Sequence, residues 1–138
     1  AIDYHGPFSY INFLVIIQAV EGFGRRFMQK EIANYRKSLP EGHKSKALHD
    51  ILSAIFKHYN DVKCINQDTD INAIVETRNY HSHLLPQKSK NAVEIIDLYY
   101  LTEELRKLLI CCILSYLSFT NEEINVITKN TYNDLFRE

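Results

Sequence analysis

Few residues in this chain can turn a backbone sharply, and its apolar residues recur at helical spacing. Among 138 residues only 4 are glycine and 3 are proline, which favours long helices over many turns. Apolar side chains in the segment 10–35 follow one another at steps of three and four, the period of an α-helix. They are Phe13, Ile16, Ile17, Val20, Phe23 and Phe27. Alternating strand patterns and internal repeats do not occur, so the sequence predicts an all-α fold.

Caps and breaks locate the first three helices. The first is predicted from Tyr10 to Tyr35, behind a cap at Ser9, because serine favours the position before a helix. The second covers residues 44–59. The third follows the capping residues 68–70 and stops by Leu85, since the residue before a proline is pushed out of the helical region.

The rest of the chain completes a bundle. The fourth helix covers residues 92–119 and is the longest. Thr120 and Glu123 have the spacing of a capping box, which opens a short fifth helix. The sequence thus predicts an up-and-down four-helix bundle with a short C-terminal helix.

Composition and charge fit one globular domain. Hydrophobic residues make up 46% and charged residues 24% of the chain, which excludes a disordered or low-complexity protein. The formal net charge is only −1, yet residues 22–63 hold nine basic and four acidic side chains, a net +5. Such asymmetry is compatible with a basic face that meets a polyanion, or with an ordinary solvated helix face.

The expected setting is a reducing cytoplasm. The three cysteines lack the paired spacing of a disulfide framework. No secretory leader opens the sequence, and no apolar run approaches the roughly 20 residues that cross a bilayer, so no membrane contact is expected. The chain begins at Ala1, and its only methionine is Met28. We therefore expect residues 1–138 to be a single helical domain from the C-terminal part of a larger protein.

One segment of the predicted third helix carries unusual side chains. Arg78 follows Ile74 by four residues, so it falls on the apolar stripe, where a charge needs a partner or a function. His83 comes five residues later, about 7.5 Å along the axis and roughly 140° around it in an ideal helix. The two would converge only if the helix loosens near His83 or if the long arginine reaches around.

Two segments together resemble a known family. Residues 78–83 read Arg-Asn-Tyr-His-Ser-His, which resembles the Arg-Asn-x-x-x-His signature of HEPN-domain ribonucleases. Residues 18–26 read Gln-Ala-Val-Glu-Gly-Phe-Gly-Arg-Arg and are similar to the "QALE-aromatic-x-RR" stretch of the ApeA-like HEPN branch. Gly24 stands where that stretch often carries a larger polar residue. The resemblance covers roughly residues 10–120 and implies a role in bacterial anti-phage defence, by abortive infection.

The resemblance implies a metal-independent endoribonuclease that needs no cofactor. By this resemblance Arg78 clamps the phosphate, His83 is the acid/base, Asn79 is a positioning residue, and Glu21 orients Arg78 or His83. The chemistry suits these residue types, because histidine titrates near neutral pH and arginine holds its charge. Attack by the ribose 2′-OH would leave a 2′,3′-cyclic phosphate, and DNA should resist.

Partners also follow from the resemblance. RNA is the expected substrate, with Arg25, Arg26 and His81 as candidate RNA contacts. Paired motifs imply a homodimer, and a neighbouring N-terminal sensor domain, missing from this chain, is expected to gate activity.

Other interpretations stay open. The domain could be a catalytically inactive HEPN-type module for dimerisation or nucleotide binding. Arg78 could simply form an ion pair with Glu21 or Glu76 as part of the fold, and His83 could be favoured by the helix dipole.

Two metal interpretations and one thiol interpretation are weaker. The pair His49-Asp50 is typical of metal-dependent phosphohydrolases, but no convincing set of further ligands accompanies it. The pair His81-x-His83 lacks a cysteine or carboxylate at ligand spacing. Residues 111–112 are adjacent cysteines in an apolar segment, which indicates core packing rather than a nucleophile.

Overall fold

The structure is a computed structural model that describes residues 5–83 and 95–135, with side chains over 10–82 and 97–129. Those residues form six α-helices and no strand, which confirms the all-α prediction. The helices are α1 (His5–Phe27), α2 (Gln29–Lys37), α3 (Ala47–His58), α4 (Ile71–His83), α5 (Ile95–Tyr116) and α6 (Asn121–Leu135). None of them is long and apolar enough to cross a membrane.

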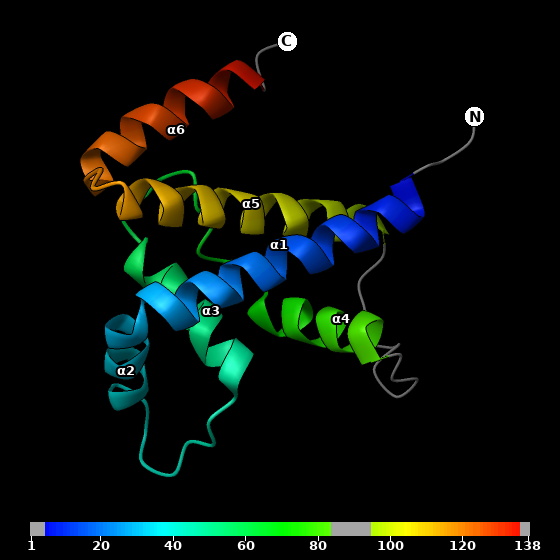
Figure 1. Ribbon diagram of the computed structural model, residues 1–138, viewed down its shortest axis with the longest axis vertical. Helices are drawn as coiled ribbons and strands as arrows, with labels where there is room; N and C mark the ends of the chain where they lie inside the picture. The colour runs from blue at the N-terminus through cyan, green and yellow to red at the C-terminus, as the bar shows by residue number, and fades with distance from the viewer. Residues whose placement is uncertain (1–4, 84–94, 136–138) are drawn as a thin grey trace.

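Helices α1 and α5 lie side by side at the centre of the molecule (Figure 1). Helices α3 and α4 pack against α1 and against each other, while α2 packs on α3. This arrangement is the predicted four-helix bundle of α1, α3, α4 and α5, with α6 added at its C-terminal end. It brings Glu21 of α1 close to α4, the helix that carries the Arg-Asn-x-x-x-His segment.

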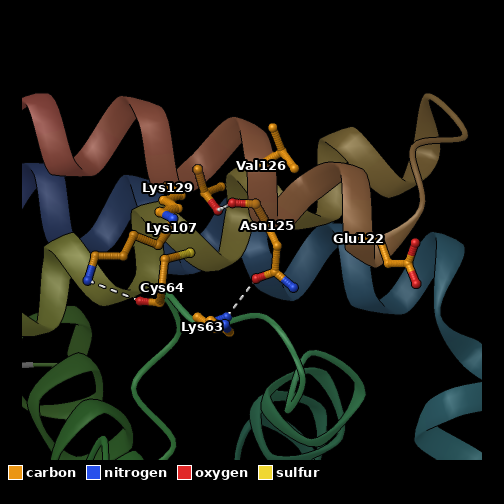
Figure 2. Close-up of a pocket in the computed structure, with 8 residues that line it drawn as sticks. Lys63, Cys64, Lys107, Glu122, Asn125, Val126 and Lys129 are labelled. Carbon is orange, nitrogen blue, oxygen red and sulfur yellow. Dashed lines mark hydrogen bonds between the residues drawn. The ribbon is translucent and has the colours of Figure 1, made fainter.

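Helix α6 is fastened to the segment between α3 and α4 (Figure 2). The amide oxygen of Asn125 accepts a hydrogen bond from the backbone N–H of Lys63 at 2.8 Å. At the start of α6, the backbone N–H of Glu123 donates to the Thr120 hydroxyl at 3.2 Å. A Glu123 carboxylate oxygen accepts the backbone N–H of Thr120 at 3.1 Å. The predicted capping box is therefore confirmed.

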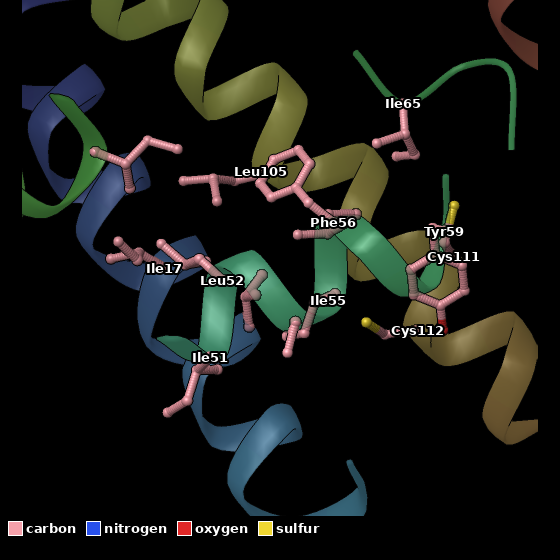
Figure 3. Packing of buried hydrophobic residues seen from close by; sticks show 14 of the residues in the cluster. Ile17, Ile51, Leu52, Ile55, Phe56, Tyr59, Ile65, Leu105, Cys111 and Cys112 are labelled. Carbon is pink, nitrogen blue, oxygen red and sulfur yellow. The ribbon is translucent and has the colours of Figure 1, made fainter. Parts of the chain in front are cut away.

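The hydrophobic core lies between α1, α3 and α5. Side chains of α3 such as Leu52 and Ile55 are fully buried between the other two helices (Figure 3). Burial of each such side chain contributes about 1.5–3 kcal/mol of favourable transfer free energy. Cys111 and Cys112 of α5 are also fully buried, which confirms the prediction that they belong to the core.

The predicted first helix is wrong in its boundaries. Helix α1 already begins at His5, so Ser9 lies inside the helix and is not its cap. The helix ends at Phe27 rather than near residue 35, because Met28 adopts φ −125° and ψ 30°. Helix α2 then continues in a new direction (Figure 1).

The bend at Met28 keeps its backbone hydrogen bonds. The N–H of Met28 donates to the Gly24 carbonyl at 3.0 Å, and the Met28 carbonyl accepts the N–H of Ile32 at 3.0 Å. Met28 and Ile32 are both buried. The chain therefore turns so that α2 can cover α3, and both backbone groups of Met28 stay paired.

Gly24 of α1 packs directly against side chains of α3, with no room for a side chain of its own. A Cβ atom there would lie 2.8 Å from Cγ2 of Ile51 and 3.2 Å from Cδ1 of Ile55. Only a glycine lets the two helices approach this closely. The contact explains why a larger polar residue is missing from this position.

Candidate functional site

One carboxylate joins the two segments singled out in the sequence. Oε2 of Glu21, on α1, lies 3.1 Å from Nη2 of Arg78, on α4. Oε1 of Glu21 accepts hydrogen bonds from Nη2 and Nε of Arg25 at 3.0 and 3.3 Å. Glu21 therefore binds a guanidinium group from its own helix and another from α4. The sequence reasoning included the pair with Arg78 but missed the second arginine, which the i, i+4 spacing could have indicated.

Asn79 completes the arrangement around Arg78. Its amide oxygen accepts a hydrogen bond from Nη1 of Arg78 at 3.0 Å. A guanidinium group has five N–H donors, and the bonds to Glu21 and Asn79 use two of them. Further donors of Arg78 are thus available to an anion, and two positive charges face one negative charge at this cluster.

The cluster lies at the surface of the bundle. The exposed fractions of the side chains are 15% for Glu21, 25% for Arg78 and 54% for Arg25. Arg25 and Arg26 both occupy the last turn of α1, and Arg26 is exposed. A phosphate could therefore approach this cluster from solvent, along the end of α1.

His83 is the last residue of α4, and its side chain lies outside the described residues. The helix stays α-helical through this position, so no loosening before it turns His83 toward Arg78. At helical spacing its Cα is about 7.5 Å further along the axis and roughly 140° around from that of Arg78. The side chain of Arg78 turns toward Glu21 of α1, and the Cα atoms of residues 78 and 83 lie on different sides of α4.

His81, a candidate RNA contact, is a packed ring. Its ring centroid lies 3.9 Å from that of Tyr10 and 4.8 Å from that of Tyr80. Its Nε2 is buried and has no hydrogen-bond partner among the described residues. Burial lowers the pKa of His81 below its ordinary value of 6.5, because the charged form loses solvation. At pH 7 this residue is neutral, unlike the exposed cation of Arg26.

The comparison with known families agrees with this geometry. The family model described as Apea-like HEPN matches residues 14–123. The chain belongs to the Apea-like HEPN family. Glu21, Arg78 and Asn79 all lie within the match. Gly24 does too, at the position where the contact between α1 and α3 leaves no room for a larger side chain. Searches of curated proteins and of solved structures gave no match.

Membership in the HEPN family suggests a nuclease-like or RNA-related module. HEPN domains are often ribonucleases, and they commonly dimerise and bind RNA. In this HEPN domain the cluster of Glu21, Arg25 and Arg78 joins α1 to α4 at the surface.

The pair His49-Asp50 has a structural role in this HEPN domain. Asp50 is fully buried at the start of α3. Its Oδ2 accepts hydrogen bonds from Arg36 Nε at 3.3 Å, Ser45 Oγ at 3.4 Å and the backbone N–H of Lys46 at 3.3 Å. Its Oδ1 lies 3.6 Å from Nε2 of His43.

Asp50 thus ties the end of α2 and the following loop to α3. Over the described parts of the chain, no group of three or more His, Cys, Asp or Glu side chains could hold a metal ion.

Proposed function

We propose that this HEPN domain is a metal-independent endoribonuclease that acts in bacterial anti-phage defence. The observation that supports the proposal is the ion pair between Glu21 and Arg78, two residues 57 positions apart. It joins the two segments that resemble the family's ribonucleases, and it leaves a surplus of positive charge at the surface. Phosphodiester cleavage needs such a charge where the phosphate gains negative charge.

Arg78 acts as the phosphate clamp in this proposal. Its planar guanidinium group stays charged and offers paired N–H donors to two phosphate oxygens. Glu21 and Asn79 each hold one of its terminal nitrogens. They act as positioning residues, because they fix the direction in which the remaining donors point.

His83 acts as the acid/base. An imidazole with a pKa of about 6.5 can accept the proton of a ribose 2′-OH or return a proton to the leaving 5′ oxygen near neutral pH. The 2′ oxygen attacks the phosphorus, the bond to the 5′ oxygen breaks, and the products are a 2′,3′-cyclic phosphate and a 5′-OH end. No metal or cofactor takes part in these steps.

The active unit is proposed to be a homodimer. HEPN domains commonly dimerise, and a second copy would bring a second Arg78 and a second His83 to one groove. Light scattering at tens of micromolar is expected to show a two-fold dimer. A monomer alone would contradict the composite site.

An inactive module for dimerisation or nucleotide binding is the second candidate. It is favoured by the pairing of Arg78 with Glu21, since a bound carboxylate competes with phosphate for the same guanidinium group. The two candidates differ in whether RNA is cut.

The deciding experiment compares RNA cleavage by the parent and by His83→Ala, with EDTA present. Loss of an acid/base group should slow cleavage about 10²–10⁴-fold. His58→Ala is the matched control, because this exposed histidine also lies in the last turn of a helix. A cyclic phosphate product and intact DNA of the same sequence are expected.

The possible outcomes separate the candidates. Cleavage that EDTA abolishes, or that His83→Ala retains in full, contradicts the proposed mechanism. A folded dimer that binds RNA or nucleotides without cutting, at high protein concentration, favours the inactive module.

A further inference from the structure

A cavity lies beside the middle of α5, at Lys107. It has a volume of about 610 Å³ and is bounded by α5, α6 and the segment between α3 and α4 (Figure 2). The residues that line it are Lys63, Cys64, Lys107, Glu122, Asn125, Val126, Thr128 and Lys129. Its volume falls within the range of about 300–1,000 Å³ that small-molecule sites occupy.

Hydrogen bonds fix the wall that carries Cys64. Asn125 of α6 accepts the N–H of Lys63 at 2.8 Å and donates to the Asp61 carbonyl at 3.0 Å. The ammonium group of Lys107, on α5, donates to the carbonyl of Cys64 at 3.3 Å. Cys64 and the residues before it are therefore tied to α5 and α6, and the cavity is preformed.

The charge of the lining favours anions. Lys107 is paired with Glu104 at 2.5 Å, while Lys63 and Lys129 are exposed and form no ion pair within the described residues. Glu122 is the only acidic residue among the lining residues. An anion that enters the cavity thus meets the ammonium groups of Lys63 and Lys129, which no described carboxylate neutralises.

The three thiols of the chain are in different environments. Cys64 is partly exposed and lines the cavity, whereas Cys111 and Cys112 are fully buried in α5. A hydrogen bond from the Cys111 thiol lowers the pKa of Cys64, and Lys107 adds to the effect. The same bond raises the pKa of Cys111, while burial raises that of Cys112 to about 12. Cys64 is thus the thiol that both reaches solvent and ionises near neutral pH.

We propose that this cavity is a modification site, in which the Cys64 sulfur forms a mixed disulfide with a small anionic disulfide of the peptide-thiol class. The Cys64 thiolate attacks one sulfur of that molecule, a new S–S bond forms, and the original S–S bond breaks. The leaving thiolate takes up a proton from water. Cys111 stays reduced, because its buried thiol keeps its proton and a thiol must ionise before it attacks.

The proposal does not depend on ribonuclease activity. Its ligand is defined by two features of the cavity, the sulfur of Cys64 on one wall and the ammonium groups of Lys63 and Lys129 in the same lining. A tripeptide-sized adduct fits the volume, and its carboxylates would lie near Lys63 and Lys129.

The experiment treats the folded chain with oxidised glutathione and maps the adduct by mass spectrometry. One adduct per chain is expected, on Cys64, formed at least about tenfold faster than on Cys111 or Cys112. Each rate is divided by the rate of the same disulfide with a small free thiol. On this scale cystamine, a cationic disulfide, should react with Cys64 about threefold more slowly than oxidised glutathione. Lys129→Gln should remove most of that preference.

Matched variants test the role of Cys111. Cys111→Ala should raise the pH midpoint of Cys64 reactivity toward the value of about 8.5 for a free thiol, while Cys111→Ser keeps a donor and should leave the midpoint near that of the parent. Cys112→Ala is the control, since it removes an equally buried thiol from the next position of α5. Circular dichroism verifies that each variant is folded.

Several results would overturn the proposal. They are faster labelling of Cys111 or Cys112 than of Cys64, no preference for the anionic disulfide, and an internal disulfide to Cys111 that leaves no adduct. An equal shift of the midpoint in Cys111→Ala and Cys112→Ala would also contradict it.

Discussion

Two carboxylates join helices in this domain, and their surroundings are opposite. Asp50 is fully buried, and its ion-pair partner Arg36 belongs to the adjacent helix α2. Glu21 is 15% exposed and binds two guanidinium groups, those of Arg25 and Arg78. The buried carboxylate of Asp50 accepts hydrogen bonds at Oδ2 from α2 and from the loop that leads into α3, so it holds that loop on the helix. The surface carboxylate of Glu21 instead joins one arginine of α1 to one of α4, and the two arginines carry more charge than it neutralises.

We call Glu21, Arg25 and Arg78 the Glu21 cluster, and Asp50 with Arg36, Ser45 and Lys46 the Asp50 cluster. The largest effect is expected at the Glu21 cluster. Arg78→Lys keeps the positive charge but loses the planar guanidinium group that can bind two phosphate oxygens at once. RNA cleavage should therefore fall about 10²–10³-fold. The melting temperature should stay close to that of the parent, because an amine can still pair with Glu21. Cleavage rates with EDTA and thermal melts measure the two quantities. Arg36→Lys, the equivalent change at the Asp50 cluster, should leave cleavage unchanged.

The next effect is on stability and belongs to the Asp50 cluster. Asp50→Ala should lower the free energy of unfolding by about 2–3 kcal/mol, since it removes a buried carboxylate that accepts three hydrogen bonds at the start of α3. Urea titration measures the loss. Glu21→Gln should cost less than about 1 kcal/mol, as expected for ion pairs near the surface. An equal loss of unfolding free energy in the two variants would contradict the view that the Asp50 cluster stabilises the fold more than the Glu21 cluster does.

A smaller effect concerns RNA affinity. Arg26→Gln should weaken RNA binding and reduce the slope of log affinity against log salt by about 0.7, the value for one phosphate contact on a single strand. Fluorescence anisotropy over a salt series gives both numbers. Lys37→Gln removes an exposed charge from the last turn of α2, and its slope should match that of the parent. If Lys37→Gln also lowers the slope relative to the parent, the RNA-binding surface extends to α2, beside the Asp50 cluster.

The smallest effect is the pH dependence of stability due to His81. Its pKa is lowered in the folded state, so the unfolded chain binds more protons as the pH falls below about 6.5. Stability from this residue is present above that pH and is lost as the pH falls further. His81→Phe keeps a ring against Tyr10 and should therefore lose less stability than the parent between pH 7.5 and 5.5. Melting temperatures at the two pH values are the measurement, and equal losses would contradict it.

Most of the helical fold could be predicted because apolar periodicity and capping are local. The spacing of Thr120 and Glu123 predicted the start of α6, and the structure contains that capping box. The bend at Met28 could not be predicted in this way, because neither glycine nor proline marks it and the apolar period continues through Phe27. Phe27 is in fact 53% exposed and packs against Tyr116, 4.8 Å between ring centroids, a contact set by the tertiary fold.

The candidate site was predictable only in part, for a related reason. An arginine on an apolar stripe requires a partner, so Arg78 could be expected to pair with Glu21 or another acid. The position of α4 against α1, which decides between them, depends on packing. The role of Asp50 depends on how residues 38–46 close back onto α3, and no periodic pattern encodes that closure.

The close contact at Gly24 also has a mechanical meaning. Because Ile51 fills the space beside Gly24, α1 cannot slide along α3 without pushing Ile51 aside. Gly24 therefore fixes the position of α1 along α3. Glu21 lies about one turn before Gly24 on the same helix, so this contact also sets the height at which its carboxylate meets Arg78 of α4.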